Sequence, residues 1–134
     1  MFKEPPTDYL LVELEKASHQ LFREDGRPRE QLVHAIDQVI DWRRYIEDNH
    51  DTVQRELGLH GISVNPRALV VIGRRASLTA DSARKLVAME NATPRLRILT
   101  YDDVLTSARA TAENILGPLW DPGPGAQVYF LPPT

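Results

Sequence analysis

The stretch Ala68-Leu-Val-Val-Ile-Gly73 is an apolar run with three consecutive β-branched residues, and a glycine closes it. A strand that is buried on both faces of a parallel sheet has this composition, because helices cover the sheet on each side. Thr79 follows as a typical N-terminal cap of a helix that we expect to reach about Asn91. A buried strand followed by a helix favours an α/β fold with parallel strands.

Further strands and helices are expected on both sides of this central stretch. Residues 8–16 and 95–99 have the composition of strands. Helical spacing and end signals are found in residues 29–48, 50–57 and 100–116. Gly58 is a typical C-terminal cap, and Thr100 with Asp103 is expected to form a capping box. The alternation of strands and helices predicts a mainly parallel sheet flanked by helices.

The composition is that of one ordinary domain. The 134 residues are 42% hydrophobic and 26% charged, and no apolar run approaches the ~20 residues that cross a bilayer. The absence of cysteine excludes disulfides, thiolate metal sites and cysteine nucleophiles. We expect a cytoplasmic protein without membrane insertion, with a domain over residues 1–118 and a Pro/Gly-rich tail over 119–134.

Charge is unevenly distributed along the chain. Residues 1–60 carry thirteen acidic and eight basic side chains, whereas residues 67–97 carry seven basic and two acidic ones. An acidic segment that can hold a metal, followed by a basic one that can meet phosphates, is typical of a metal-dependent enzyme acting on a polyanion. The alternative is that the arginines only solvate two helices and a strand edge.

Two carboxylates in the first strand are the strongest candidates for a site. Glu13 and Glu15 are two residues apart, so both point to the same face, while Leu14 points to the other face, towards a core. The two carboxylates and the Leu14 carbonyl offer oxygen ligands to Mg²⁺ or Mn²⁺. Asp8 is rejected as a third ligand because its odd spacing puts it on the opposite face. The alternative is an edge strand whose acidic side faces solvent.

Gln38 is the next candidate, on the long helix. His34, Gln38 and Trp42 follow at intervals of four residues and form one stripe. The Gln38 amide can hold a metal-bound water or a phosphate, and Trp42 can stack or pack; a plain surface stripe is the alternative. Arg74 and Arg75 follow the central strand, where α/β sheets bind ligands, and are candidate phosphate contacts.

Four stretches of the chain, taken together and in order, carry a resemblance to a known family. They are Val12-Glu-Leu-Glu-Lys-Ala-Ser18, Ala35-Ile-Asp-Gln-Val-Ile-Asp-Trp-Arg-Arg-Tyr-Ile46, Leu69-Val-Val-Ile-Gly-Arg74 and Ile98-Leu-Thr-Tyr-Asp-Asp-Val-Leu105. The combination, which spans about residues 8–116, resembles the C-terminal catalytic domain of the Shedu family. These proteins are bacterial anti-phage defence nucleases of the PD-(D/E)XK superfamily.

The resemblance implies a restriction-endonuclease-like core and a DNA endonuclease that depends on Mg²⁺ or Mn²⁺. Glu13 matches the acidic residue of the E-x-K motif, and Glu15 stands where that motif commonly has lysine. Gln38 and Trp42 match the helical Q-x-x-x-Y element, with tryptophan in place of tyrosine. DNA is therefore the expected partner, and assembly into a homo-oligomer stays open.

The sequence departs from the family pattern before the first strand. The superfamily's aspartate normally lies on a strand that precedes the E-x-K strand, and only a few residues precede it here. We therefore expect an N-terminally incomplete Shedu-type domain whose first core strands are missing. A catalytically inactive remnant that binds DNA or a protein is the alternative from another class. A third possibility is a small α/β regulatory module that is unrelated to nucleases.

Overall fold

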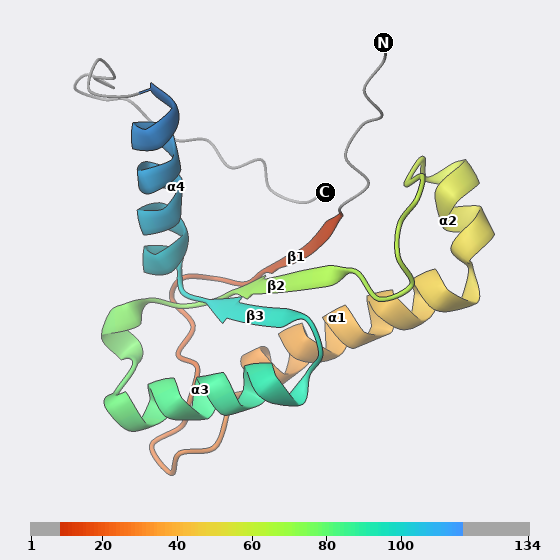
Figure 1. Ribbon diagram of the computed structural model, residues 1–134. Coiled ribbons are helices and arrows are strands. Elements are labelled where there is room, and N and C mark those ends of the chain that lie inside the picture. Colours follow the sequence, from red (N-terminus) through yellow and green to blue (C-terminus); the bar gives the residue numbers. More distant parts are fainter. Residues whose placement is uncertain (1–8, 117–134) are drawn as a thin grey trace.

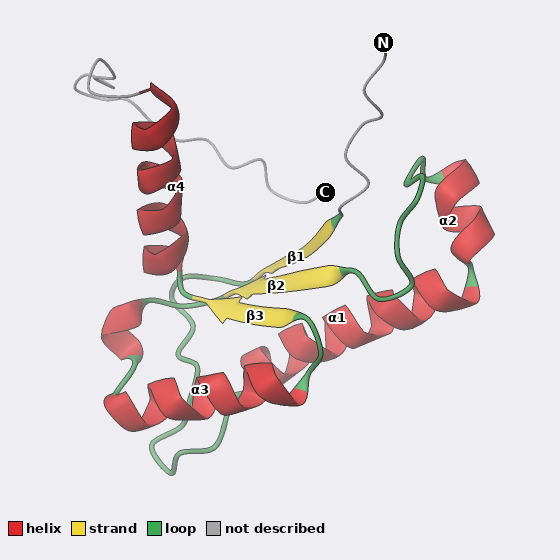
Figure 2. Cartoon of the chain, in the orientation of Figure 1, coloured by secondary structure: helices red, strands yellow, loops and turns green. Residues whose placement is uncertain are grey.

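The computed structural model describes residues 9–116, with side chains up to residue 113. It contains a three-stranded parallel sheet in the order β1-β2-β3, formed by β1 (Leu10–Leu14), β2 (Arg67–Val71) and β3 (Leu96–Leu99) (Figures 1 and 2). The predicted α/β class and parallel pairing are confirmed. The expectations for Asp8 and for the 119–134 tail concern residues outside the described range.

The helices lie where the sequence pattern predicted them, to within a residue or two. Their bounds are α1 (Glu30–Asp48), α2 (His50–Glu56), α3 (Ala80–Ala92) and α4 (Tyr101–Leu116), with a short 3₁₀ turn at Arg75–Ser77. The Thr79 hydroxyl accepts the Ser82 backbone N–H at 3.1 Å, as an N-terminal cap does. Gly58 adopts a φ of +71° just after α2, in agreement with its predicted capping role.

One face of the sheet carries the main hydrophobic core. Figure 1 shows α1 and α3 on the same side of the sheet, and both contribute to this core. Ala68, Val70 and Ile72 of the central strand and its continuation point into this core and are at most 2% exposed. The helices and the flanking strands complete it with Leu32, Ala35, Ile36, Val39, Leu86, Leu96 and Ile98. Alternation along β2 thus directs every second residue to the helix-covered face.

The direction of the Leu14 side chain differs from the prediction. Leu11, two residues before Glu13, packs against the α1/α3 core, and Glu13 pairs in register with the core residue Val70. The carboxylates therefore point to the helix-covered face, and Leu14 points to the opposite one. The sequence pattern groups residues by face correctly, but it does not specify which face the helices cover.

Helix α4 stands on the other side of the sheet (Figure 1). It begins directly after β3, and the Tyr101 N–H donates to the Gly73 carbonyl at 3.0 Å. Thr100 and Asp103 form the predicted capping box, with N–H···O distances of 3.0 and 3.3 Å. Within the described residues, none of the helices combines the length and apolar character that a membrane span requires.

Candidate metal centre at the end of the edge strand

Glu13 and Glu15 lie at the C-terminal end of β1, the strand at one edge of the sheet. Glu13 is inside the strand, whereas Glu15 directly follows it and remains tied to β2, because its N–H donates to the Val71 carbonyl at 2.9 Å. Both side chains are partly buried, between the sheet and α1. The predicted juxtaposition of the two carboxylates is therefore present.

The environment of Glu13 disfavours its charged form. Burial raises the pKa of Glu13 above its usual value of 4.5, and the negative charge of Glu15 raises it further. His34 on α1 acts in the opposite direction and lowers this pKa. A cation between the two carboxylates would relieve the repulsion, because it would favour the ionised form of both.

The backbone adds one oxygen to the pair. The Glu15 N–H points to β2, and the peptide bond between Leu14 and Glu15 is trans. The Leu14 carbonyl therefore points the opposite way, to the open edge of β1. The Leu14 carbonyl oxygen is therefore accessible to a metal ion at the edge of the sheet. Its role as a metal ligand stays a prediction.

The predicted helical stripe lies along α1 beside β1. The Gln38 Nε2 and His34 Nε2 atoms are 3.3 Å apart, so the two side chains are hydrogen-bonded. His34 and Glu15 line a common surface hollow of about 530 Å³. Trp42 and Val39 close a hollow of about 460 Å³ along the outer edge of β1. His34 is thus a neighbour of the carboxylates, and Gln38 is linked to them through its hydrogen bond with His34. Trp42 lines the same hollow as Glu13.

Trp42 is half exposed and belongs to a small aromatic pair. Its ring meets Tyr45 edge-on, with centroids 6.3 Å apart and an interplanar angle of 79°. The two rings, Gln38 and Leu57 line a further hollow of about 360 Å³. The Trp42 ring therefore packs against a neighbour and also offers an accessible surface, and its role in stacking on a ligand stays a prediction.

Two further residues lie at the site that the sequence pattern did not single out. The Tyr101 hydroxyl donates to the Glu15 carbonyl, and His19 Nε2 lies 4.0 Å from a Glu15 carboxylate oxygen. Burial and the charge of Glu15 raise the pKa of Tyr101. Tyr101 comes two residues after the end of β3, and the C-terminal ends of parallel strands share one edge of the sheet, so the position of Tyr101 in the sequence was a usable signal. His19 lies in the irregular 15–29 loop, and no helix or strand pattern in this loop predicts where its side chain lies.

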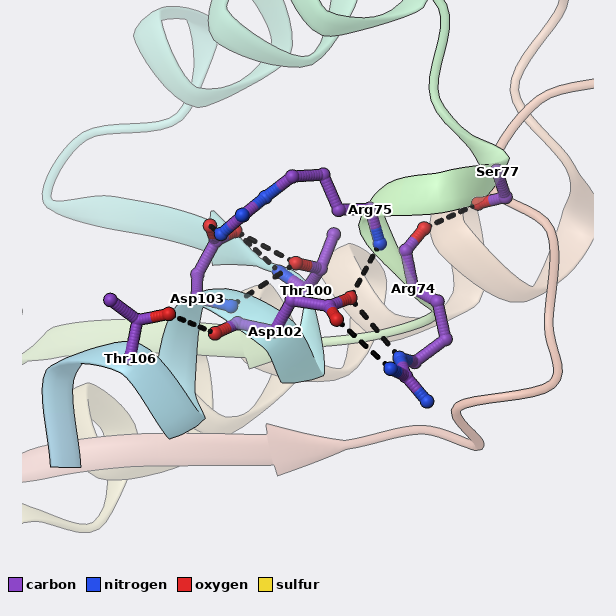
Figure 3. A network of polar contacts seen from close by, with 7 residues as sticks. All are labelled: Arg74, Arg75, Ser77, Thr100, Asp102, Asp103 and Thr106. Atoms are coloured by element: carbon purple, nitrogen blue, oxygen red, sulfur yellow. Dashed lines mark hydrogen bonds and ion pairs between the residues drawn. The ribbon is translucent and has the colours of Figure 1, made fainter. Parts of the chain in front are cut away.

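Arg74 and Arg75 each contact an aspartate at the start of α4 (Figure 3). Arg74 makes two bonds to Asp102, at 3.0 and 3.1 Å, and Arg75 Nη2 contacts Asp103 at 2.7 Å. The Arg74 guanidinium and the Arg75 backbone N–H hold the pKa of Asp102 well below its usual range. Both arginine side chains nevertheless remain more than half exposed, at 56% and 60%. They therefore combine a structural role with accessible positive charge.

The oxygen donors at this site are few for an ion held by protein side chains alone. In residues 9–116, no cluster of three or more His, Asp or Glu side chains could hold a metal ion. Two carboxylates and one carbonyl are nevertheless hard oxygen donors, and Mg²⁺ is commonly held by one or two carboxylates together with waters and substrate phosphates. The residues present therefore fit a weak Mg²⁺ or Mn²⁺ site that relies on further ligands, and they do not form an all-protein cage.

The fold and this site define an α/β protein with a carboxylate pair at the end of its edge strand. Residues 2–105 match the sequence family described as the C-terminal region of the Shedu protein SduA. The match covers more than half of the chain, so the chain belongs to this family, and membership indicates a role in anti-phage defence. No curated protein matches the sequence.

Proposed function

We propose that this chain carries the metal-dependent DNA endonuclease site of a Shedu-type defence protein, on a restriction-endonuclease-like core. The observation that supports this best is the Glu13–Glu15 pair, with the pKa of Glu13 raised by burial and by its neighbour. Glu13, Glu15 and the Leu14 carbonyl would hold Mg²⁺ or Mn²⁺. Such an ion, when bound, polarises a phosphodiester and lowers the pKa of a bound water.

The chain's own side chains prepare the surroundings of that ion. The Gln38 amide is hydrogen-bonded to His34, whose charge acts on Glu13, and this bond fixes the orientation of the amide. An amide held in this way can orient a water or a phosphate oxygen without changing charge. Tyr101 anchors the Glu15 backbone through its carbonyl, which limits the movement of the second carboxylate.

DNA would approach over the C-terminal ends of the strands. Arg74 and Arg75 lie at this edge, and a phosphate can share their exposed guanidinium groups with Asp102 and Asp103. Trp42 offers a ring face at the other end of the groove beside β1. These contacts would position the backbone of the substrate and would not specify its sequence.

Nicking of supercoiled plasmid DNA tests this proposal. We expect Mn²⁺-dependent or Mg²⁺-dependent nicking that falls at least about a hundredfold in Glu13→Gln and in Glu15→Gln, since each removes a charged ligand. Glu47→Gln, on the exposed side of α1, is the matched control and should keep the full rate. No nicking by the unchanged chain with either ion, and no binding of either ion by calorimetry, would contradict the proposal.

A second candidate function is a non-catalytic module that binds DNA or a protein through the same fold. The specific observation in its favour is that the described residues contain no cluster of three or more acidic or histidine side chains that could hold a metal ion. This function predicts DNA binding without cleavage. Binding should then weaken steeply with salt and should decrease in Arg74→Gln and Arg75→Gln, whereas Glu13→Gln should leave it unchanged.

A further inference from the structure

The face of the sheet opposite α1 and α3 carries an apolar hollow of about 540 Å³. The hollow lies in the corner between the sheet and α4, and one side of that helix lines it at intervals of about four residues. The lining residues are Leu69, Leu99, Val104, Ser107, Ala108, Thr111 and Ala112. This corner is thus formed almost entirely by carbon atoms.

The apolar surface continues from the hollow onto the edge strand. Leu10 and Val12 lie on the same face as Leu69, and 54% and 44% of their surfaces are exposed. Parallel sheets normally have both faces covered, because their strands are apolar on both sides. Here α1 and α3 cover one face of the sheet, whereas the described residues cover this face only beside α4. An exposed apolar area of this kind marks a docking surface.

The chain itself contains a segment that suits this surface. α4 ends at Leu116, and the sequence that follows brings Val128, Tyr129, Phe130 and Leu131 together in an apolar, β-favouring run. The sixteen residues of α4 span about 24 Å. The twelve residues from 117 to 128 can span about 40 Å when extended. The run can therefore return along α4 to the sheet.

We propose that residues 128–131 dock on the open face of the sheet, in the hollow beside α4 and over Leu69, Leu99 and Val12. The proposal is independent of the nuclease proposal, because none of these residues belongs to the carboxylate site. Docking would bury the exposed apolar groups of β1 and would cover the second face of the sheet. It would also connect the C-terminal segment to α4, which contacts Arg74, Arg75 and Glu15.

The absence of native cysteine makes a thiol-labelling test direct. Ala108→Cys places a thiol in the hollow, and Ala110→Cys places one on the exposed side of the same helix as the matched control. Each is made in the complete chain, alone and together with Phe130→Asp or with the control substitution Gln127→Asp. The rate of reaction with a charged thiol reagent is then measured at two chain concentrations, about tenfold apart.

The proposal predicts that Ala108→Cys reacts slowly and that Phe130→Asp speeds this reaction about tenfold or more, since a buried aromatic side chain is exchanged for a charge. Gln127→Asp should change nothing, and Ala110→Cys should react quickly throughout. Equal rates at Ala108→Cys and Ala110→Cys would overturn the proposal. Protection that grows with chain concentration would also overturn it, because a second copy would then be the occupant.

A second measurement covers the case in which Phe130→Asp prevents folding. Ala108→Cys combined with Tyr129→Cys should form an intrachain disulfide under mild oxidation, whereas Ala110→Cys combined with Tyr129→Cys should not. Mass spectrometry of the unreduced monomer separates the two results. Equal cross-linking in both pairs, or cross-linking in neither, contradicts docking in this hollow.

Discussion

Glu13 is an ionisable residue at a strand position that faces the core, where an apolar residue is usual. It pairs in register with the fully buried Val70, on the face that packs against α1. Leu11 occupies the preceding position on this face and does pack into the core. The raised pKa of Glu13 is the energetic consequence of this placement, because burial and the neighbouring charge of Glu15 both disfavour its ionised form.

This placement predicts a pH-dependent effect of Glu13→Gln on the free energy of unfolding. Below the usual pKa of 4.5 the side chain is protonated in both states, so its burial carries no charge penalty. As the pH rises through the raised pKa of the folded state, charged Glu13 destabilises the fold. We therefore expect Glu13→Gln to be more stable than the unchanged protein at pH 7, with the difference vanishing near about pH 4.

Urea unfolding at both pH values measures this effect. Glu24→Gln, in the exposed part of the 15–29 loop, is the control and should be close to neutral at pH 7. A Glu13→Gln protein that is less stable than the unchanged protein at pH 7 would show that charged Glu13 is stabilised by a partner.

At the scale of elements, the loop after β1 is held against the end of β2 at one glycine. Gly73 has a φ of +68°, and its N–H donates to the Lys16 carbonyl at 3.2 Å. A Cβ atom at this position would lie 2.6 Å from both the His19 carbonyl oxygen and Leu21 Cδ1. The close approach of two backbones therefore fixes the loop that carries Glu15 and His19.

This contact predicts different outcomes for two glycine substitutions. Gly58 has a similar φ of +71°, but a Cβ there would meet no described atom within 4 Å. Gly58→Ala should therefore cost only the backbone penalty of about 1 kcal/mol. Gly73→Ala combines this penalty with the collision and should cost about 2 kcal/mol more.

Urea unfolding compares the two glycine variants, and plasmid nicking adds a functional measurement. If the endonuclease proposal is correct, Gly73→Ala should also reduce nicking, because the displaced loop carries Glu15, whereas Gly58→Ala should not. Equal losses of stability in the two variants would contradict this prediction, because they would mean that the 15–29 loop moves away from a Cβ atom at position 73 without a further loss of stability.

At the scale of the whole molecule, Arg43 connects α1 to the starts of two strands. It is 9% exposed, and its Nε and Nη2 atoms donate to the Pro66 carbonyl at 3.1 and 2.8 Å. Nη2 also donates to the Arg95 carbonyl at 3.1 Å, and Arg95 itself has the left-handed φ of +56°. Burial, followed by the charge of Arg95, lowers the pKa of Arg43. One guanidinium thus satisfies the carbonyls that precede β2 and β3.

Arg43→Met should therefore destabilise the protein by about 2–4 kcal/mol. The buried Pro66 carbonyl loses both guanidinium donors and the Arg95 carbonyl keeps only the Ala68 N–H, while the side-chain stem is kept. Arg44→Met removes the same charge from an exposed position on the next residue and should change stability by less than about 0.5 kcal/mol. Thermal and urea unfolding measure both. A loss in Arg43→Met that equals the loss in Arg44→Met would show that water replaces the guanidinium at no cost.

The sequence by itself determined the order of strands and helices, their ends and the parallel sheet. These features depend on local chemistry: the spacing of apolar residues, the Thr79 cap and the Thr100–Asp103 capping box, which the structure reproduces. Strand alternation likewise established that Glu13 and Glu15 share a face. Interactions between residues a few positions apart are sufficient for the elements, their ends and the shared face, because helices and strands repeat over such distances. The parallel pairing joins strands far apart in the sequence, and the sequence indicated it only through the alternation of strands and helices.

Only the tertiary structure decided which face of β1 the helices cover. It therefore decided that the carboxylates, and not Leu14, point to the α1 side. It also brought Tyr101 to Glu15 and placed Asp102 and Asp103 against Arg74 and Arg75, across separations of 86 and about 28 residues. Strand periodicity is symmetric between the two faces of a sheet. The choice between them depends on how the helices pack, which no short stretch of sequence contains.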